Sequence, residues 1–183
     1  SLLHCQHMNA DQYANIYGQF RWQVPRDVHW CELCCARWAR QTPHAVAVVA
    51  ESEQGVVVHH RYAELHDAAL RCAGALSALG VARGDRVAIV MPQRFETAVA
   101  QMAVSALGAV AMPLSMLFGA EALQYRLTDS EAKVAIVDES AIEALLAAAR
   151  ECPLLEHIVA VGAAAGRGSI DWDAALRAPR AAF

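Results

Sequence analysis

The feature that most constrains the fold is a regular alternation of short apolar runs with amphipathic segments in the second half of the chain. The apolar runs match strands buried on both faces of a parallel sheet, and the segments between them carry apolar residues at helical spacing. This pattern predicts strands at 86–91, 109–112, 133–137 and 157–161 and helices at 95–106, 120–127 and 141–150. The sequence therefore predicts an α/β fold, a doubly wound, mostly parallel sheet with flanking helices.

The first third of the chain has a different pattern. We expect residues 1–43 to form an N-terminal arm with one helix at 28–40, and residues 44–183 to form the α/β subdomain. Apolar runs at 45–50 and 56–62 flank a polar, glycine-containing turn and predict a hairpin. A helix follows from Tyr62 and ends before Gly80. A capping box, Ser140 with Glu143, predicts the start of a later helix, and one or two helical turns are expected at 171–177.

Composition excludes several classes of protein. With 56% hydrophobic residues and a net charge of −4, the chain has ample surface to bury, and nothing indicates a nucleic-acid partner. Residues 97–120 carry no charge, but Gln101, Gly108 and Pro113 interrupt them and they divide into a helix and a strand, so we expect no membrane span. Six cysteines without a secretory pattern before them indicate reduced thiols and a cytoplasmic protein.

The usual catalytic and metal patterns are weak in this sequence. His4, Cys5 and His7 with Cys31, Cys34 and Cys35 could supply zinc ligands, but three of these cysteines fall on a predicted helix, so packed thiols are favoured and no metal is expected. The glycine-rich segment 162–168 matches neither phosphate-binding pattern and is interpreted as a surface turn. His59, His60 and His66 are interpreted as solvated or half-buried side chains rather than bases. No catalytic residue is predicted.

The loop at 113–119 is the candidate ligand-binding segment. It follows the carboxyl end of a predicted strand, which is where ligands gather in open α/β sheets. Ser115 and Gly119 could approach a ligand there, while Met116, Leu117 and Phe118 could form an apolar wall. A buried crossover packed on its own helix explains the same residues equally well. The residues alone thus indicate an α/β domain without an assigned function.

Five segments, taken in order, resemble the N-terminal part of the adenylate-forming (AMP-dependent) acyl-CoA synthetases. They are 61–65 (RYAEL), 79–92 (LGVARGDRVAIVMP), 105–114 (SALGAVAMPL), 117–122 (LFGAEA) and 125–138 (YRLTDSEAKVAIVD), and Asp171-Trp172 resembles the region before the family's phosphate loop. The resemblance implies a full-length ligase that uses ATP, CoA and Mg to convert a carboxylate to an acyl-adenylate and then to an acyl-CoA. The family's phosphate loop and catalytic lysine would lie beyond residue 183, and the only lysine, Lys133, begins a predicted strand.

The same resemblance implies that Ser115, Phe118 and Gly119 line the acyl or CoA channel. The loop is similar to that of synthetases for fatty or aromatic acids, because the glycine pair of acetyl-CoA synthetases is missing. We expect the fragment to be inactive alone, to hold no cofactor, and to self-associate through the side of its sheet left uncovered. Two alternatives remain: a free-standing α/β ligand-binding or regulatory domain without ligase activity, and a zinc-stapled module.

Overall fold

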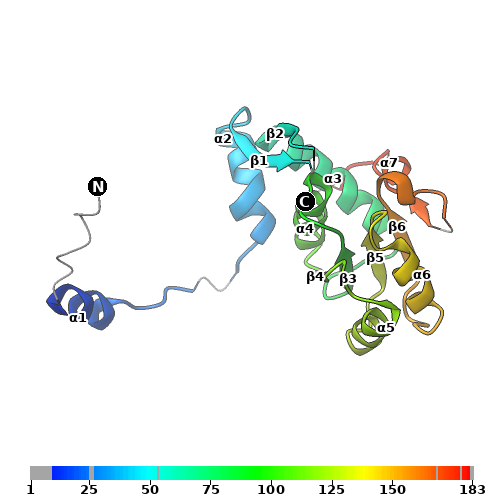
Figure 1. The fold of residues 1–183 in the computed structure, drawn as a ribbon. Helices are drawn as coiled ribbons and strands as arrows, with labels where there is room; N and C mark the ends of the chain where they lie inside the picture. Colours follow the sequence, from blue (N-terminus) through cyan, green and yellow to red (C-terminus); the bar gives the residue numbers. More distant parts are fainter. Residues whose placement is uncertain (1–9, 25–26, 53, 168, 178, 182–183) are drawn as a thin grey trace.

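The computed structural model describes residues 10–24, 27–52, 54–167, 169–177 and 179–181, and its body is a layered α/β unit (Figure 1). The central sheet consists of β3 (Arg86–Val90), β4 (Val110–Pro113), β5 (Val134–Val137), β6 (His157–Ala160) and β7 (Ile170–Asp171). The strand order is β4-β3-β5-β6-β7, and all four neighbouring pairs are parallel. The predicted doubly wound fold is confirmed.

Helices cover both faces of this sheet. α3 (Tyr62–Ala78) and α4 (Phe95–Ala106) form one core with Val87 and Ile89, which point to one face of β3. α5 (Ala120–Asp129) and α6 (Ile142–Ala149) form a second core with Ala88 and Val90 on the opposite face. Because side chains alternate between the faces, a strand buried on both sides must be apolar throughout. This requirement explains the uninterrupted apolar runs.

The strand order places a topological switch point between β3 and β5. The chain passes from β3 to β4 on one side and then crosses to β5 on the other side of β3. The loops that leave the carboxyl ends of β3 and β5 therefore lead to helices on opposite faces and separate, which creates a crevice. On the outer edge, β4 ends in Pro113, which has no backbone N–H, and this suits an edge strand.

The N-terminal part contains more structure than predicted. Helix α1 (Ala10–Gln19) was not predicted, and Figure 1 shows it apart from the sheet. The helix predicted at 28–40 is confirmed, running from Trp30 through a π-helical turn η1 (Glu32–Ala36) into α2 (Arg37–Gln41). The predicted hairpin is also present, with β1 (Val46–Glu51) antiparallel to β2 (Val57–Arg61).

The predicted capping box at Ser140 is wrong. α6 begins at Ile142, and its N-cap residue, Ala141, makes no side-chain hydrogen bond. The Ser140 N–H, which Glu143 would accept in a capping box, donates instead to Asp138 Oδ1 at 3.0 Å, and the Ser140 hydroxyl donates to the same oxygen. A reciprocal bond of the capping-box kind occurs at α3, where the Arg61 N–H donates to Glu64 Oε2 at 3.0 Å.

The C-terminal segment forms three short elements, of which only the strand β7 joins the sheet. Residues 162–164 form a short 3₁₀ turn, η2 (Gly162–Ala164), within the segment interpreted as a surface turn. The expected helical turns are α7 (Trp172–Ala175), where the Asp171 side chain accepts from the Ala174 N–H at 2.6 Å. The two-residue strand β7 before it was not predicted.

The structure partly tests the expectations about a membrane span and a zinc site. No helix among the described residues is long and apolar enough to span a bilayer, and residues 97–120 divide into α4, β4 and a loop as expected. Within the described part of the chain, no three His, Cys, Asp or Glu side chains are grouped to hold a metal ion. His4, Cys5 and His7 lie outside it, while Cys31 and Cys35 are buried in the first core.

Candidate functional site

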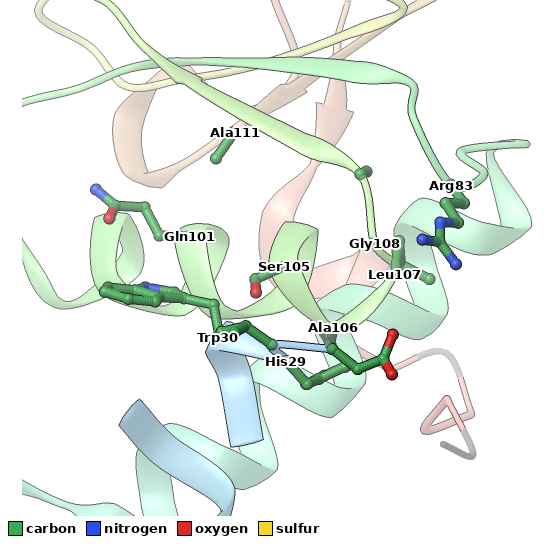
Figure 2. A pocket seen from close by; sticks show the side chains of 12 residues that line it. His29, Trp30, Arg83, Gln101, Ser105, Ala106, Leu107, Gly108 and Ala111 are labelled. Carbon is green, nitrogen blue, oxygen red and sulfur yellow. The ribbon is translucent and has the colours of Figure 1, made fainter. Parts of the chain in front are cut away.

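Two large cavities lie at opposite ends of the sheet. The first measures about 700 Å³ and lies beside the amino ends of β3 and β4. Figure 2 shows two of its lining residues, Trp30 and Gln101, with the Trp30 ring next to the Gln101 side chain. Arg83 and Ser105 also line it, and the Ser105 hydroxyl accepts the Cys31 N–H at 3.1 Å. Ligands of open α/β sheets gather at the carboxyl ends of the strands, so this cavity is the weaker candidate.

The second cavity lies at the switch point. It measures about 720 Å³, which is within the usual range for small-molecule sites. We call it the switch-point cavity. One wall is the β1–β2 hairpin, with Ala50, Val56, Val58 and His60. The opposite wall is formed by the loops that follow the strands of the sheet, with Pro92, Arg94, Met116, Asp138, Glu139 and Ser140. The hairpin wall also carries Glu51, Ser52 and Gln54 at its turn, so it is apolar at Val56 and Val58 and polar at its end, whereas the opposite wall is mainly polar.

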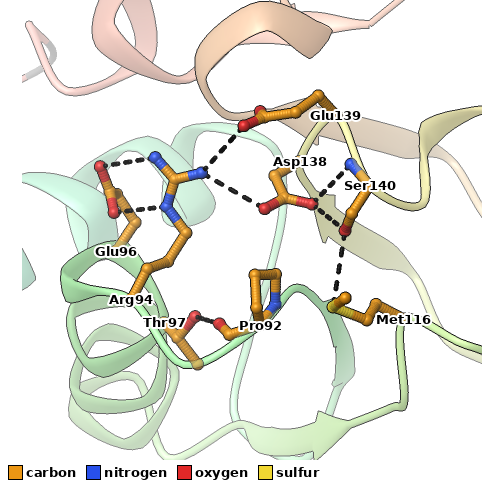
Figure 3. A network of polar contacts seen from close by, with 8 residues as sticks. All are labelled: Pro92, Arg94, Glu96, Thr97, Met116, Asp138, Glu139 and Ser140. Carbon is orange, nitrogen blue, oxygen red and sulfur yellow. Dashed lines mark hydrogen bonds and ion pairs between the residues drawn. The ribbon is translucent and has the colours of Figure 1, made fainter. Parts of the chain in front are cut away.

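The polar side is organised by Arg94, as Figure 3 shows. Its guanidinium donates to both carboxylate oxygens of Glu96, at 2.8 and 3.3 Å, and to Asp138 Oδ2 at 3.3 Å. The Glu96 bond is the main reason that the pKa of Arg94 is raised above its usual value. Asp138 is 2% exposed and also accepts the Ser140 N–H at 3.0 Å, so this carboxylate is fully desolvated but well partnered.

The charge of this wall is negative. Glu139 Oε1 lies 3.7 Å from Arg94 Nη1, so one guanidinium faces three carboxylates, those of Glu96, Asp138 and Glu139. Two negative charges remain uncompensated on this wall, and Glu51 on the hairpin wall adds a third. A phosphate or a free carboxylate would be repelled there, whereas a cation or a neutral group would not.

An aromatic stack joins the two walls. The His60 ring lies on Phe95, with centroids 3.7 Å apart and planes 11° from parallel. His60 Nδ1 also lies 3.8 Å from Glu64 Oε2. The hairpin is therefore fixed to the start of α4, which keeps the cavity open between them.

The three residues predicted to line a channel share one loop but have different surroundings. The Ser115 hydroxyl accepts the Leu117 N–H at 3.2 Å, and the Phe118 ring lies under the Arg126 guanidinium at 4.1 Å. Gly119 is exposed, and a Cβ added there would meet nothing within 4 Å. None of the three lines the switch-point cavity, which takes Met116 from this loop instead. Their role in a channel stays a prediction.

Lys133 lies at the opposite end of the sheet from this cavity. Its Nζ donates to the Gly80 carbonyl at 2.7 Å and lies 3.5 Å from the Asp85 carboxylate. The Ala82 N–H donates to the same carboxylate and is the main cause of its lowered pKa. These contacts connect the start of β5 to the turn before β3, so the only lysine has a structural role.

Comparison with known proteins assigns the family. A family model described as "AMP-binding enzyme" matches residues 35–179. The chain belongs to the AMP-binding enzyme family. One relative is an acetyl-coenzyme A synthetase of Pasteurella multocida, which is 36% identical over 71% of this chain and 19% of its own length. Another is the mitochondrial acetyl-coenzyme A synthetase 2-like protein of Homo sapiens, which is 30% identical over 78% of this chain and 22% of its own length. The chain thus spans about a fifth of the length of these relatives.

Two solved structures confirm the fold. The acyl-CoA synthetase of Brucella canis matches with a TM-score of 0.77 and 23% identity, over 90% of this chain and 32% of that one. An anthranilate CoA ligase in complex with anthranoyl-AMP matches with a TM-score of 0.72 and 22% identity, over 84% and 29%. The predicted resemblance to the N-terminal part of acyl-CoA synthetases is therefore confirmed.

Proposed function

We propose that the chain is the N-terminal part of an AMP-forming acid–CoA ligase. The parent enzyme would join a carboxylate to ATP, release pyrophosphate, and transfer the acyl group to CoA, with Mg as the metal. The observation that carries this proposal is the family match over residues 35–179, together with relatives that are about five times longer than the matched region.

The chemistry of the described residues supports inactivity of the chain alone. Activation of a carboxylate by ATP needs positive groups or a metal ion that hold the phosphates and stabilise developing charge. Here the cavity at the carboxyl ends of the strands carries excess negative charge, and Lys133 is bound at the other end of the sheet. The groups that hold ATP, Mg and CoA would come from the rest of the parent enzyme.

We propose a fatty or aromatic acid as the substrate. The loop at 113–119 has one glycine and four large apolar side chains, Leu114, Met116, Leu117 and Phe118, and a channel beside it would be apolar. Acetate is the second candidate, because the curated relatives described above bear the name acetyl-coenzyme A synthetase. Acid-dependent pyrophosphate release by the complete gene product, measured with octanoate, benzoate and acetate, distinguishes the two substrate assignments. A higher kcat/KM for acetate would overturn the fatty or aromatic assignment.

We also propose that Ser115, Phe118 and Gly119 line the acyl or CoA channel. Gly119 offers the sharpest test, because an added methyl group meets no neighbour and leaves the fold intact. In the complete enzyme, Gly119→Ala should raise KM for CoA or for the acid while the melting temperature is unchanged. Gly18→Ala is the matched control, since that position is equally open and lies on α1. Unchanged KM values for both ligands would remove Gly119 from the channel.

A further inference from the structure

The arm exposes an arginine between two aromatic side chains. Phe20 and Trp22 are 55% and 83% exposed, and their rings meet edge to face with centroids 5.1 Å apart. The Arg21 guanidinium donates to the Gly18 and Phe20 carbonyls, which lie in its own segment. These are its hydrogen-bond partners within the described residues. We call Phe20, Arg21 and Trp22 the arm motif. So much aromatic surface beside an uncompensated cation indicates a contact surface.

The switch-point cavity has the complementary properties. Its hairpin wall exposes Val56 and Val58, which are 60% and 46% exposed. Its opposite wall carries the two uncompensated negative charges, and Glu139 is the most accessible of the three carboxylates, with 54% of its side chain exposed. A guanidinium flanked by aromatic rings would neutralise this charge and cover the valines in one contact.

We infer that the arm motif of one copy of this chain binds in the switch-point cavity of a second copy. Arg21 would pair with Glu139, and Phe20 and Trp22 would pack against Val56 and Val58. A second copy is the occupant because Figure 1 shows the arm leading away from its own body, where it makes no contact with the cavity. Reciprocal exchange of the two arms gives a closed twofold dimer.

The area is at the lower end of what a specific dimer needs. A fully buried aromatic side chain covers about 150–250 Å², and Phe20 and Trp22 have 55% and 83% of their surface left to bury, so the two rings of one arm cover roughly 200–350 Å². Counting the cavity surface and both arms, the dimer buries roughly 800–1,400 Å², which overlaps the lower end of the range for specific interfaces. This inference rests on the cavity and the arm and does not depend on ligase activity.

Sedimentation velocity of the purified chain over a concentration series tests the inference. The wild-type chain should show a monomer–dimer equilibrium, and Arg21→Glu or Glu139→Arg alone should weaken dimerisation about tenfold or more, because each places like charges together. The combined variant, with both charges exchanged, should return to within about threefold of wild type. Trp22→Ser should also abolish the dimer, and Arg150→Glu, an exposed charge change away from both surfaces, should not affect it.

Several results would overturn the inference. A wild-type chain that is monomeric at every concentration would do so, whether the arm is free or bound to its own body. A dimer that persists in both single reversals would place the interface elsewhere, for example on the β4 edge of the sheet, where Val110 is exposed. Trp22→Ser keeps the test decisive if Glu139→Arg does not fold, because Trp22 is exposed on the arm and its replacement leaves the body unchanged.

Discussion

Removal of the Arg94 side chain gives the most quantitative prediction. Arg94→Met leaves Asp138, 2% exposed, without a counter-charge and also removes the paired bonds to Glu96. Loss of one partner of a buried ion pair costs about 3–5 kcal/mol. Arg94 is 29% exposed and Asp138 keeps its bonds from Ser140, so we expect the lower end, about 3 kcal/mol. For a chain of this size that lowers the melting temperature by roughly 6–12 °C.

A double-mutant cycle isolates the charge effect. Asp138→Asn keeps an acceptor for Ser140 but removes the buried charge, so Arg94→Met in that background should cost only about 1 kcal/mol. The coupling of about 2 kcal/mol is read from urea denaturation of the four proteins, with Arg150→Met as the control for loss of an exposed arginine. A coupling below about 0.5 kcal/mol would refute the view that Arg94 and Asp138 act as a pair.

Two further predictions concern stability. In Gly74→Ala the new Cβ would overlap the Pro179 carbonyl oxygen, so the segment at 179–181 must move away from α3. We expect faster proteolysis of this segment, and equal cleavage rates would contradict the contact. Burial lowers the pKa of His66 in the folded chain below its ordinary value in the unfolded chain. The contribution of His66 to the unfolding free energy is therefore fully present above the ordinary pKa and is lost as the pH falls from that value to the pKa of the folded chain. His66→Gln should therefore flatten the unfolding free energy between pH 7.5 and 5.5, and an unchanged slope would show that His66 does not titrate this way.

The sequence predicted the buried strands best. β3 and β5 lie between helices on both faces of the sheet, so both sides of each strand are buried. Their sequences are therefore runs of apolar residues, without the alternation of polar and apolar positions that a half-exposed strand shows. β7 was missed because two residues, Ile170 and Asp171, have no detectable period. The Ser140 capping box failed because α6 begins one residue later than predicted and the Asp138 carboxylate accepts the Ser140 N–H that Glu143 would have taken. Local patterns thus succeed where burial is uniform and fail where one tertiary or neighbouring contact decides.

The polar wall of the candidate site could not be predicted in the same way. Arg94 and Asp138 are 44 positions apart, and only the order β4-β3-β5 brings their loops together. One signal was present: both residues follow closely after wholly apolar strands, where the carboxyl ends of neighbouring strands meet. Without the strand order, that signal does not indicate which loops are neighbours.

Carboxylate-dependent pyrophosphate release in the presence of ATP and Mg decides whether this chain is part of an acid–CoA ligase. It is measured on the purified 183-residue chain and on the complete product of the gene that encodes it. We expect acid-dependent release, with AMP as the second product, from the complete protein and none from the chain alone. Sustained turnover by the chain itself, or none by the complete protein with any acid tested, would contradict this expectation.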